Sequence, residues 1–299
     1  MPTLPATSTQ PRTSRARAPT KTPWERFPLD VLPVIYITEQ CYCEHTVHLW
    51  LKAPSSMVSI PRKLEGRGGP PLALRQAADT GLAFHEQAAE STQAVSESTL
   101  RKLVRSEQSL VVAESPLLAV YEDLSIAGVP DAVHFESAIA RCVLDYKVTD
   151  SNQLHMGHRV QLLLYGWLLQ ESGLRLSDTL MVSVLIPNVS AGAFVELDEF
   201  ERRRLAVTLH HRARAVVDEE PERKNWYVKK LPLSEGFWVR LRIFRYDRRV
   251  AKRELGFFAP YWKGERAAIP TSNLRKCRVC LYNSTGSCKE ALAPFEGGL

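Results

Sequence analysis

The 299-residue chain has no apolar run approaching the roughly 18 to 20 residues that a membrane-spanning helix requires. The apolar stretch around Met181–Ile186 is only as long as a β-strand. No secretory signal is recognisable, so disulfides are a poor first interpretation of the six cysteines. Internal repeats are also absent. These absences predict a protein with no membrane partner and a cytoplasmic location.

Acidic residues are missing from the start of the chain, where none precedes Glu25. Residues 1–24 are instead rich in Pro, Ser, Thr and Arg, which predicts a disordered basic tail. An organellar transit peptide has the same composition, so an organellar location is the alternative. The net charge of +6 and the pI of about 9.0 favour a polyanionic partner without establishing one.

Hydrophobic periodicity predicts an α/β fold with a mixed sheet over residues 25–299, which we expect to form one domain. Strands are expected at Ser115–Glu122, Leu124–Phe135, Ile139–Val148 and Thr179–Ile186. Helices are expected within 72–105 and at His155–Glu171, Leu197–Glu219 and Arg240–Arg253. On the third of these helices, the pattern predicts that His210 and His211 lie on a solvated face.

A carboxylate and an ammonium group share one face of the strand Ile139–Val148, because alternate residues of a strand point the same way. These residues are Asp145 and Lys147, while Cys142 points to the opposite face and is expected to be buried. Asp131 lies near the middle of the preceding predicted strand. If the two strands pair antiparallel, Asp131 and Asp145 converge, and two carboxylates are suitable ligands for Mg²⁺ or Mn²⁺.

Four motifs now occur in order: Gly81–Glu86, Gly128–Asp131, Asp145–Lys147 and Gln161–Tyr165. Together they resemble the RecB-like branch of the PD-(D/E)xK nucleases. The resemblance implies a restriction-endonuclease-like mixed central sheet flanked by helices, with its core at about 72–190. It also implies the following roles: metal ligation by His85, Asp131, Asp145 and the Tyr146 backbone carbonyl, and catalysis by Asp131, Asp145, Lys147, Gln161 and Tyr165.

Outside this context, several of these residues have simpler readings. His85 would be a core histidine that caps a helix. Asp131 would be a turn residue, and Gln161 with Tyr165 would be an ordinary amphipathic helix edge.

Three cysteines, Cys277, Cys280 and Cys288, lie within twelve residues, a spacing that suits Zn²⁺ or an iron–sulfur cluster equally. A fourth ligand is needed, and Cys43 or Cys41 is the candidate. The arrangement resembles the CRISPR-associated exonucleases, the exonuclease V family and AddB-type nucleases, in which a [4Fe–4S] cluster clips the chain ends together. This implies a helical lobe from 31–60 and 255–299, with a zinc knuckle as the alternative.

The segment Tyr42-Cys43-Glu44-His45 resembles the Tyr-Cys-Pro-Arg of the CRISPR-associated members, which favours Cys43 over Cys41. The sequence departs from that pattern at Glu44 and His45, which leaves the subfamily open.

Arginines crowd the segment after residue 239, with aromatic residues between them. Phosphate contacts combined with aromatic stacking are a way to bind single-stranded DNA. The candidate DNA-binding residues are Arg240, Arg242, Arg245, Arg248 and Arg249. The alternative is a solvated amphipathic helix whose aromatic residues, such as Phe237 and Phe244, belong to the core.

The resemblance implies a metal-dependent DNA exonuclease that acts on single-stranded or frayed DNA. A CRISPR-associated member would trim DNA for spacer integration alongside the adaptation integrase. The alternative is a stand-alone repair or recombination exonuclease of the exonuclease V or AddB type. The chain has no Gly-x-x-x-x-Gly-Lys-Ser/Thr phosphate loop, so any helicase must be a separate chain. A non-catalytic iron–sulfur or zinc DNA-binding subunit is a further possibility, against which the intact Asp131, Asp145 and Lys147 argue.

Overall fold

The computed structural model of the protein describes residues 31–52, 102, 104–105 and 108–296. The N-terminal tail, His85 and most of the expected helical segment 72–105 lie outside these residues.

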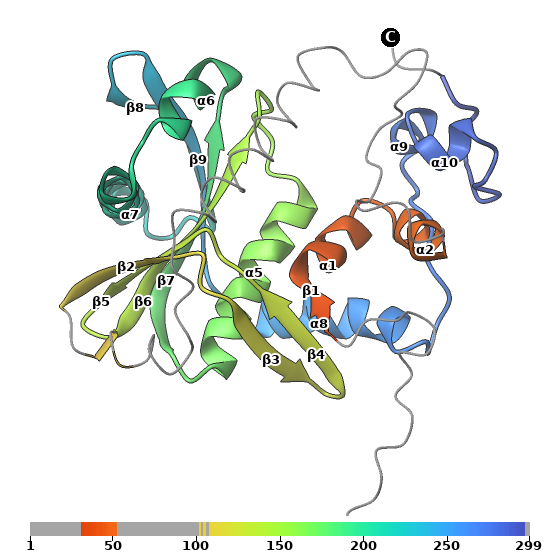
Figure 1. Ribbon diagram of the computed structural model, residues 1–299, viewed down its shortest axis with the longest axis horizontal. Helices are drawn as coiled ribbons and strands as arrows, with labels where there is room; N and C mark the ends of the chain where they lie inside the picture. The colour runs from red at the N-terminus through yellow and green to blue at the C-terminus, as the bar shows by residue number, and fades with distance from the viewer. Residues whose placement is uncertain (1–30, 53–101, 103, 106–107, 297–299) are drawn as a thin grey trace, which may run out of the picture.

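A six-stranded mixed sheet forms the centre of the described chain (Figure 1). The strand order is β2-β5-β6-β7-β9-β8. Only β6 and β7 are parallel neighbours, and helix α5 connects them. The bounds are β2 Ser109–Ala113, β5 Ala132–Glu136, β6 Ile139–Val148, β7 Arg175–Ile186, β8 Asn225–Ser234 and β9 Phe237–Arg245. This architecture confirms the expected mixed α/β fold, which is consistent with a restriction-endonuclease-like arrangement.

A second, three-stranded sheet has the order β1-β4-β3. Its strands are β1 Leu32–Pro33, β3 Leu117–Tyr121 and β4 Leu124–Gly128. The prediction of one continuous strand over Leu124–Phe135 was therefore wrong, because β4 and β5 belong to different sheets. After β4, the chain leaves the three-stranded sheet at Val129-Pro130-Asp131, where Pro130 has no N–H to continue a strand ladder.

Helices cover both faces of the central sheet (Figure 1). One face packs against α5, which in turn contacts α1 and α8, and the other packs against α7, with α6 against β9. The bounds are α1 Val34–Gln40, α2 Glu44–Lys52, α5 Met156–Glu171, α6 Asn188–Val195, α7 Glu199–Glu219, α8 Arg248–Trp262, α9 Leu274–Arg278 and α10 Leu281–Ser284. We refer below to the α5 face and the α7 face.

Helix α7 begins where a capping box predicts it. The Asp198 side chain accepts a hydrogen bond from the Glu201 N–H, and the Glu201 side chain accepts one from the Asp198 N–H. Helix α8 begins after Asp247, whose carboxylate accepts hydrogen bonds from the N–H groups of Arg249 and Val250. The predicted helix from Arg240 was therefore wrong, since β9 continues to Arg245 before α8 starts.

Strand β6 lies between β5 and β7 and separates two layers of core. Val143 packs on the α5 side, whereas Cys142 and Leu144 pack on the α7 side. The expected burial of Cys142 on the face opposite Asp145 is thus confirmed. A tight turn with positive φ at Ser137 and Ala138 joins β5 to β6 and produces the expected antiparallel pairing.

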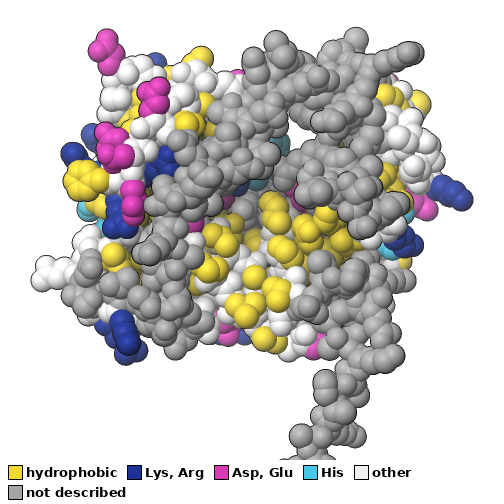
Figure 2. Space-filling view, in the orientation of Figure 1, with side chains coloured by type: hydrophobic (Ala, Val, Ile, Leu, Met, Phe, Trp, Pro, Cys, Tyr) yellow, Lys and Arg dark blue, Asp and Glu magenta, His cyan; other side chains and the backbone are white. Residues whose placement is uncertain are grey.

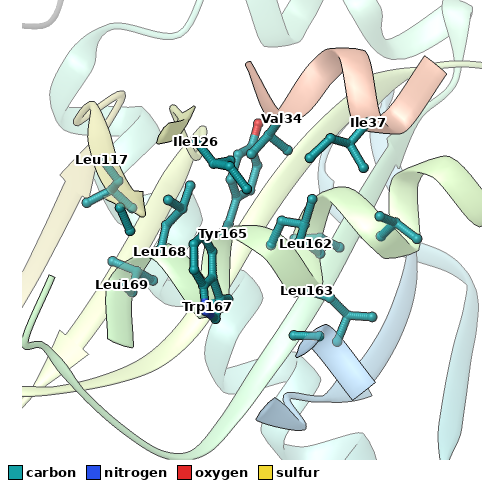
Figure 3. Packing of buried hydrophobic residues seen from close by; sticks show 14 of the residues in the cluster. Val34, Ile37, Leu117, Ile126, Leu162, Leu163, Tyr165, Trp167, Leu168 and Leu169 are labelled. Carbon is teal, nitrogen blue, oxygen red and sulfur yellow. The ribbon is translucent and has the colours of Figure 1, made fainter. Parts of the chain in front are cut away.

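Helix α5 supplies much of the core on its face. Figure 3 shows Tyr165 and Leu168 packed with Ile126 of β4 and Val34 of α1. At the point of contact, Gly128 has no side chain, and a Cβ atom there would lie only 2.9 Å from the Tyr165 ring. Gly128 therefore allows the Tyr165 side chain to pack directly against β4.

The N-terminal helices and the C-terminal segment lie together. Arg266 forms a two-pronged ion pair with the buried Glu44 carboxylate, which also accepts a hydrogen bond from the Ile269 N–H. The Lys276 ammonium donates to the Tyr42 carbonyl at 2.7 Å. These contacts explain one departure from the family pattern, because Glu44 anchors the chain's C-terminal segment.

The surface seen in Figure 2 is uneven in character. Apolar side chains gather over the middle of this face, and charged ones gather over α6 and α7. The exposed apolar residues include Leu118 and Val120 of β3 and Ile35 of α1. Within the described ranges, no helix has the length and apolar character needed to cross a bilayer.

Candidate nuclease site

Strand β6 presents Asp145 and Lys147 on the α5 face, as the alternation of the sequence predicts. The Lys147 Nζ lies 2.9 Å from the Asp145 Oδ1. The Asp145 side chain is completely buried, whereas the Lys147 side chain is 19% exposed. A buried carboxylate is costly without a compensating cation, and Lys147 supplies that positive charge.

Asp131 reaches the same place from the chain that enters β5. Its Oδ2 accepts a hydrogen bond of 2.6 Å from the backbone N–H of Tyr146, which lies between Asp145 and Lys147. The structure therefore brings Asp131 next to the Asp145–Lys147 pair. Burial raises the pKa of the Asp131 carboxyl, while the positive charge of Lys147 and the Tyr146 hydrogen bond oppose that rise.

A third carboxyl group, Glu114, lies at the end of β2. Its backbone N–H donates to the Asp131 carbonyl at 3.3 Å. Burial and the negative charge of Asp131 raise the pKa of Glu114 to about 7, against the opposing charge of Arg202. Sequence reasoning gave Glu114 no role, because only the pairing of β2 with β5 brings it to Asp131.

Gln161 and Tyr165 face the carboxylates from α5, one turn apart. The Gln161 Nε2 donates to the Tyr165 hydroxyl oxygen at 2.7 Å. Burial raises the pKa of Tyr165 well above its ordinary value, and the charges of Asp145 and Asp131 raise it further. The phenol is therefore neutral, and its O–H is available as a donor beside two acids. The Gln161 Oε1 is buried and has no hydrogen-bond partner within the described part of the chain.

Ser183 of β7 is a neighbour that the sequence analysis missed. It pairs with Asp145 in the parallel ladder, so both side chains point to the α5 face. It is fully buried, and its hydroxyl has no hydrogen-bond partner among the described residues. The sequence did contain a sign of this residue, because Ser183 is the one polar residue within the apolar stretch Met181–Ile186.

The oxygen donors of this site suit Mg²⁺ or Mn²⁺. The buried Asp145 and the half-buried Asp131 both lie near the Lys147 ammonium group, and hard divalent cations prefer such oxygen ligands. The Tyr146 backbone passes between them. His85, the other expected ligand, lies outside the described residues.

The candidate DNA-binding arginines do not form one continuous strip. Arg240 and Arg242 alternate on β9 and point to the α5 face, in register with Leu185 and Ser183 of β7. Arg245 instead pairs with Asp178, and Arg248 pairs with Glu171. Arg249 is exposed at the start of α8.

Arg240 and Arg242 support the loop that follows β6. The Arg240 guanidinium donates to the carbonyls of Asp150 and Ser151 at 2.8 and 3.1 Å. The Arg242 guanidinium donates to the Asn152 carbonyl and lies 3.6 Å from the Tyr227 ring centroid. Both arginines therefore stabilise the conformation of this loop.

Two of the interleaved aromatic residues belong to the core, as the alternative reading held: Phe237 and Phe244 are 4% and 2% exposed. Trp238, by contrast, is half-buried and lies beneath the Arg240 guanidinium, 5.1 Å from ring centroid to Cζ.

The four cysteines chosen from the sequence line one pocket between the N-terminal helices and the C-terminal segment. They are Cys43, Cys277, Cys280 and Cys288, together with the neighbouring Lys276. Cys41 does not line this pocket: its thiol donates to the Ile37 carbonyl at 3.4 Å. Burial raises the pKa of Cys41 to about 12, so this thiol stays protonated. Cysteine thiolates are the ligands that thiophilic metals prefer.

Comparison with known proteins identifies the superfamily of the chain. No curated protein matches the chain. A solved structure titled "Crystal structure of SSO0001" is similar at 13% identity, with a TM-score of 0.40 and coverage of 88% of both chains. A family model described as the PD-(D/E)XK nuclease superfamily matches residues 45–285. That match extends across β6 and its neighbouring strands, and the chain belongs to the PD-(D/E)XK nuclease superfamily, whose members are metal-dependent nucleases.

Proposed function

We propose that the protein is a metal-dependent exodeoxyribonuclease that acts on single-stranded or frayed DNA. The observation that carries this proposal is the 2.6 Å hydrogen bond from the Tyr146 N–H to Asp131. It supports a single centre at which two carboxylates and the Lys147 ammonium group meet.

Asp131 and Asp145 would hold Mg²⁺ or Mn²⁺, with His85 and the Tyr146 carbonyl as further ligands. A divalent ion in such a site lowers the pKa of a bound water and withdraws charge from the scissile phosphate. Lys147, held 2.9 Å from Asp145, would orient the attacking water and neutralise charge that develops on the phosphate.

Gln161 and Tyr165 would position the phosphate. Because the Tyr165 oxygen accepts from Gln161, its own O–H is free to donate to a phosphate oxygen or a water. The raised pKa of Tyr165 supports this role, since a neutral phenol retains its proton at physiological pH.

Digestion of end-labelled DNA with Mg²⁺ or Mn²⁺ tests the nuclease. Asp145→Asn and Lys147→Met should each reduce cleavage by at least a hundredfold, comparable to the loss of a transition-state contact. Glu199→Gln, which changes an exposed carboxylate on α7, is the matched control and should cleave normally. Cleavage that survives in both site variants would contradict the assignment.

The exonuclease part of the proposal has its own test. A linear single strand and a covalently closed single-stranded circle of the same sequence are digested in parallel. Only the linear strand should be degraded. Digestion of both would retain the nuclease and reject the requirement for an end.

We also propose that a [4Fe–4S] cluster is held by Cys43, Cys277, Cys280 and Cys288. Their common pocket supports the proposal, as does the nearby Lys276, which joins the C-terminal segment to the carbonyl of Tyr42. The cluster would fasten the two ends of the described chain to each other and would act structurally. A zinc ion held by the same thiolates is the alternative.

Iron and acid-labile sulfide, measured on protein purified without oxygen, separate the two metals. A brown protein with both elements is expected, and a colourless zinc protein would reject the cluster. Cys43→Ser should lose the iron. Cys41→Ser, two residues away and outside the pocket, is the matched control and should retain it.

We further propose that the protein trims DNA before spacer integration and that the CRISPR adaptation integrase is its partner. The resemblance at Tyr42–Cys43 supports this role. A repair or recombination exonuclease that works with a separate helicase is the alternative. The genes beside the coding sequence distinguish them, and purified adaptation integrase should bind the protein only in the first case.

A further inference from the structure

We propose a second metal site, for Zn²⁺ or a similar transition-metal cation, formed by His134, Glu136 and His210. It lies on the α7 face, so the sheet separates it from the nuclease site. Nothing in the nuclease chemistry above uses these residues.

The three residues come from two elements that pack together. His134 and Glu136 are on β5, and His210 is on α7, which contacts that strand. His134 pairs with Cys142, whose side chain belongs to the core on the α7 face. Sequence reasoning placed His210 on a solvated surface, and that was wrong, since His210 is only 3% exposed.

The distances fit a single ion. The ligand atoms of the three side chains all lie within 4.8 Å of one another. The two histidines approach at 2.7 Å between their Nδ1 atoms, and His210 Nδ1 lies 3.6 Å from the Glu136 Oε1. Ligands of tetrahedral Zn²⁺ at about 2.0–2.2 Å from the metal lie roughly 3.3 Å apart. A small rotation of the two rings is enough to admit the ion.

Hydrogen bonding prepares His134 for this role. Its Nε2 lies 3.0 Å from the Ser109 Oγ. With that N–H donating to the serine, the lone pair of His134 is at Nδ1 and points at His210. An outer hydrogen bond of this kind commonly fixes the tautomer of a metal-binding histidine.

Both imidazole rings are buried, with His134 0% and His210 3% exposed, and a metal binds imidazole in its uncharged form. The Nε2 of His210 is buried and has no hydrogen-bond partner among the described residues. In the tautomer with the proton on Nε2, the lone pair of the His210 Nδ1 is available to the metal ion.

The cation would replace an arginine at the carboxylate ligand. Arg141 lies 3.8 Å from Glu136 and would give way to the ion, whereas Arg214 is paired with Asp178. Glu136 is 36% exposed at the β5–β6 turn, which leaves a route for the ion from solvent. Two imidazoles with one carboxylate favour Zn²⁺ over Mg²⁺, because nitrogen ligands suit borderline cations. A water or His211, whose ring centroid lies 5.3 Å from that of His210, would complete the coordination.

The direct test is anomalous diffraction at the zinc edge from crystals of the full chain grown with ZnCl₂. A peak is expected about 2.0–2.2 Å from His134, Glu136 and His210. Zinc found only at the cysteines or at Asp131 and Asp145 would overturn the proposal.

Solution binding supplies a second measurement, with the metal-free chain titrated against a zinc-chelating dye. His210→Gln and the half-exposed Glu136→Gln should each weaken one class of zinc site at least tenfold. Ser109→Ala should weaken it about 10- to 100-fold. His211→Gln is the matched control for the neighbouring helix position, and it should change the affinity by less than His210→Gln.

The same titration distinguishes this site from the nuclease centre and the cysteines. Asp145→Asn should leave the zinc affinity of the His134–Glu136–His210 site unchanged. When Co²⁺ replaces zinc, the spectrum of this class should lack the sulfur-to-metal charge-transfer absorption that thiolate ligands produce. Equal affinities in Glu136→Gln, His210→Gln and wild type would refute the site, whatever the outcome for DNA cleavage.

Discussion

Replacing Gly128 with alanine should disturb both the stability of the fold and the nuclease site. The new Cβ atom would lie 2.8 Å from the Leu168 Cδ1, 2.9 Å from the Tyr165 Cε1 and 3.0 Å from the Val34 Cγ2. Such distances require the neighbours to shift. The terminal methyl groups of Leu168 can move by a rotamer change. The Tyr165 ring cannot move as easily, because it is packed in the core and its hydroxyl oxygen accepts a hydrogen bond from Gln161.

Overpacking of this kind costs about 1–3 kcal/mol, and we expect roughly 2 kcal/mol for Gly128→Ala. In a chain of this size, that corresponds to a fall of about 3–4 °C in Tm. Displacing the Tyr165 hydroxyl by a fraction of an ångström should lower the rate of DNA cleavage by roughly tenfold. Thermal unfolding and end-labelled digestion measure the two effects on the same preparation.

Gly192→Ala is the matched control, because a Cβ at Gly192 in α6 would meet no atom within 4 Å. Alanine is preferred over glycine in a helix by about 1 kcal/mol, so this variant should be as stable as wild type or more so. Adding Leu168→Ala to Gly128→Ala should relieve part of the clash, giving a total cost below the sum of the two single changes. If Gly128→Ala melts and cleaves like wild type, the reasoning about this contact is wrong.

Three further predictions concern other parts of the molecule. In the metal-free chain, His210 binds protons more weakly when folded, because its pKa falls from 6.5 to about 3. Stability should therefore be lost as pH drops below 6.5, by roughly 2 kcal/mol from this group at pH 5; urea unfolding should show a shallower pH dependence in His210→Gln and a smaller change in His211→Gln, because His211 is only one contributor to the lowered pKa of His210. Arg266→Ala leaves the buried Glu44 without its cationic partner, and it should weaken docking of the C-terminal segment by roughly 3 kcal/mol. Hydrogen exchange in that segment should rise, whereas the exposed Arg275→Ala should leave it unchanged. Arg240→Ala should weaken binding of single-stranded DNA, and an affinity that is unchanged at low salt would remove this arginine from the DNA path.

Local patterns were enough to predict the parts of the fold that depend on nearby residues. Strand β6 runs from Ile139 to Val148 as expected, because its alternation and its turn residues agree. The meeting of Asp131 with the Asp145–Lys147 pair follows from one hairpin, so the sequence could anticipate it.

Features that depend on distant contacts were missed. Strand β9 looked helical because its arginines are dense, although Val239, Leu241 and Ile243 alternate with Arg240 and Arg242 as a strand requires. His210 looked solvated because its neighbours in the sequence are charged. Its real partner, His134, is 76 residues away and is brought to it only when α7 packs on β5.

The two faces of β6 carry separate tasks on adjacent residues, with Asp145 on one side and Leu144 and Tyr146 on the other. A slip of one residue in its pairing with β5 or β7 would turn Asp145 into the apolar layer beneath α7 and place apolar side chains next to Asp131 instead. We expect such a shifted strand to be inactive. Recovery of DNA cleavage during refolding would therefore report directly on correct strand alignment at the centre of the molecule.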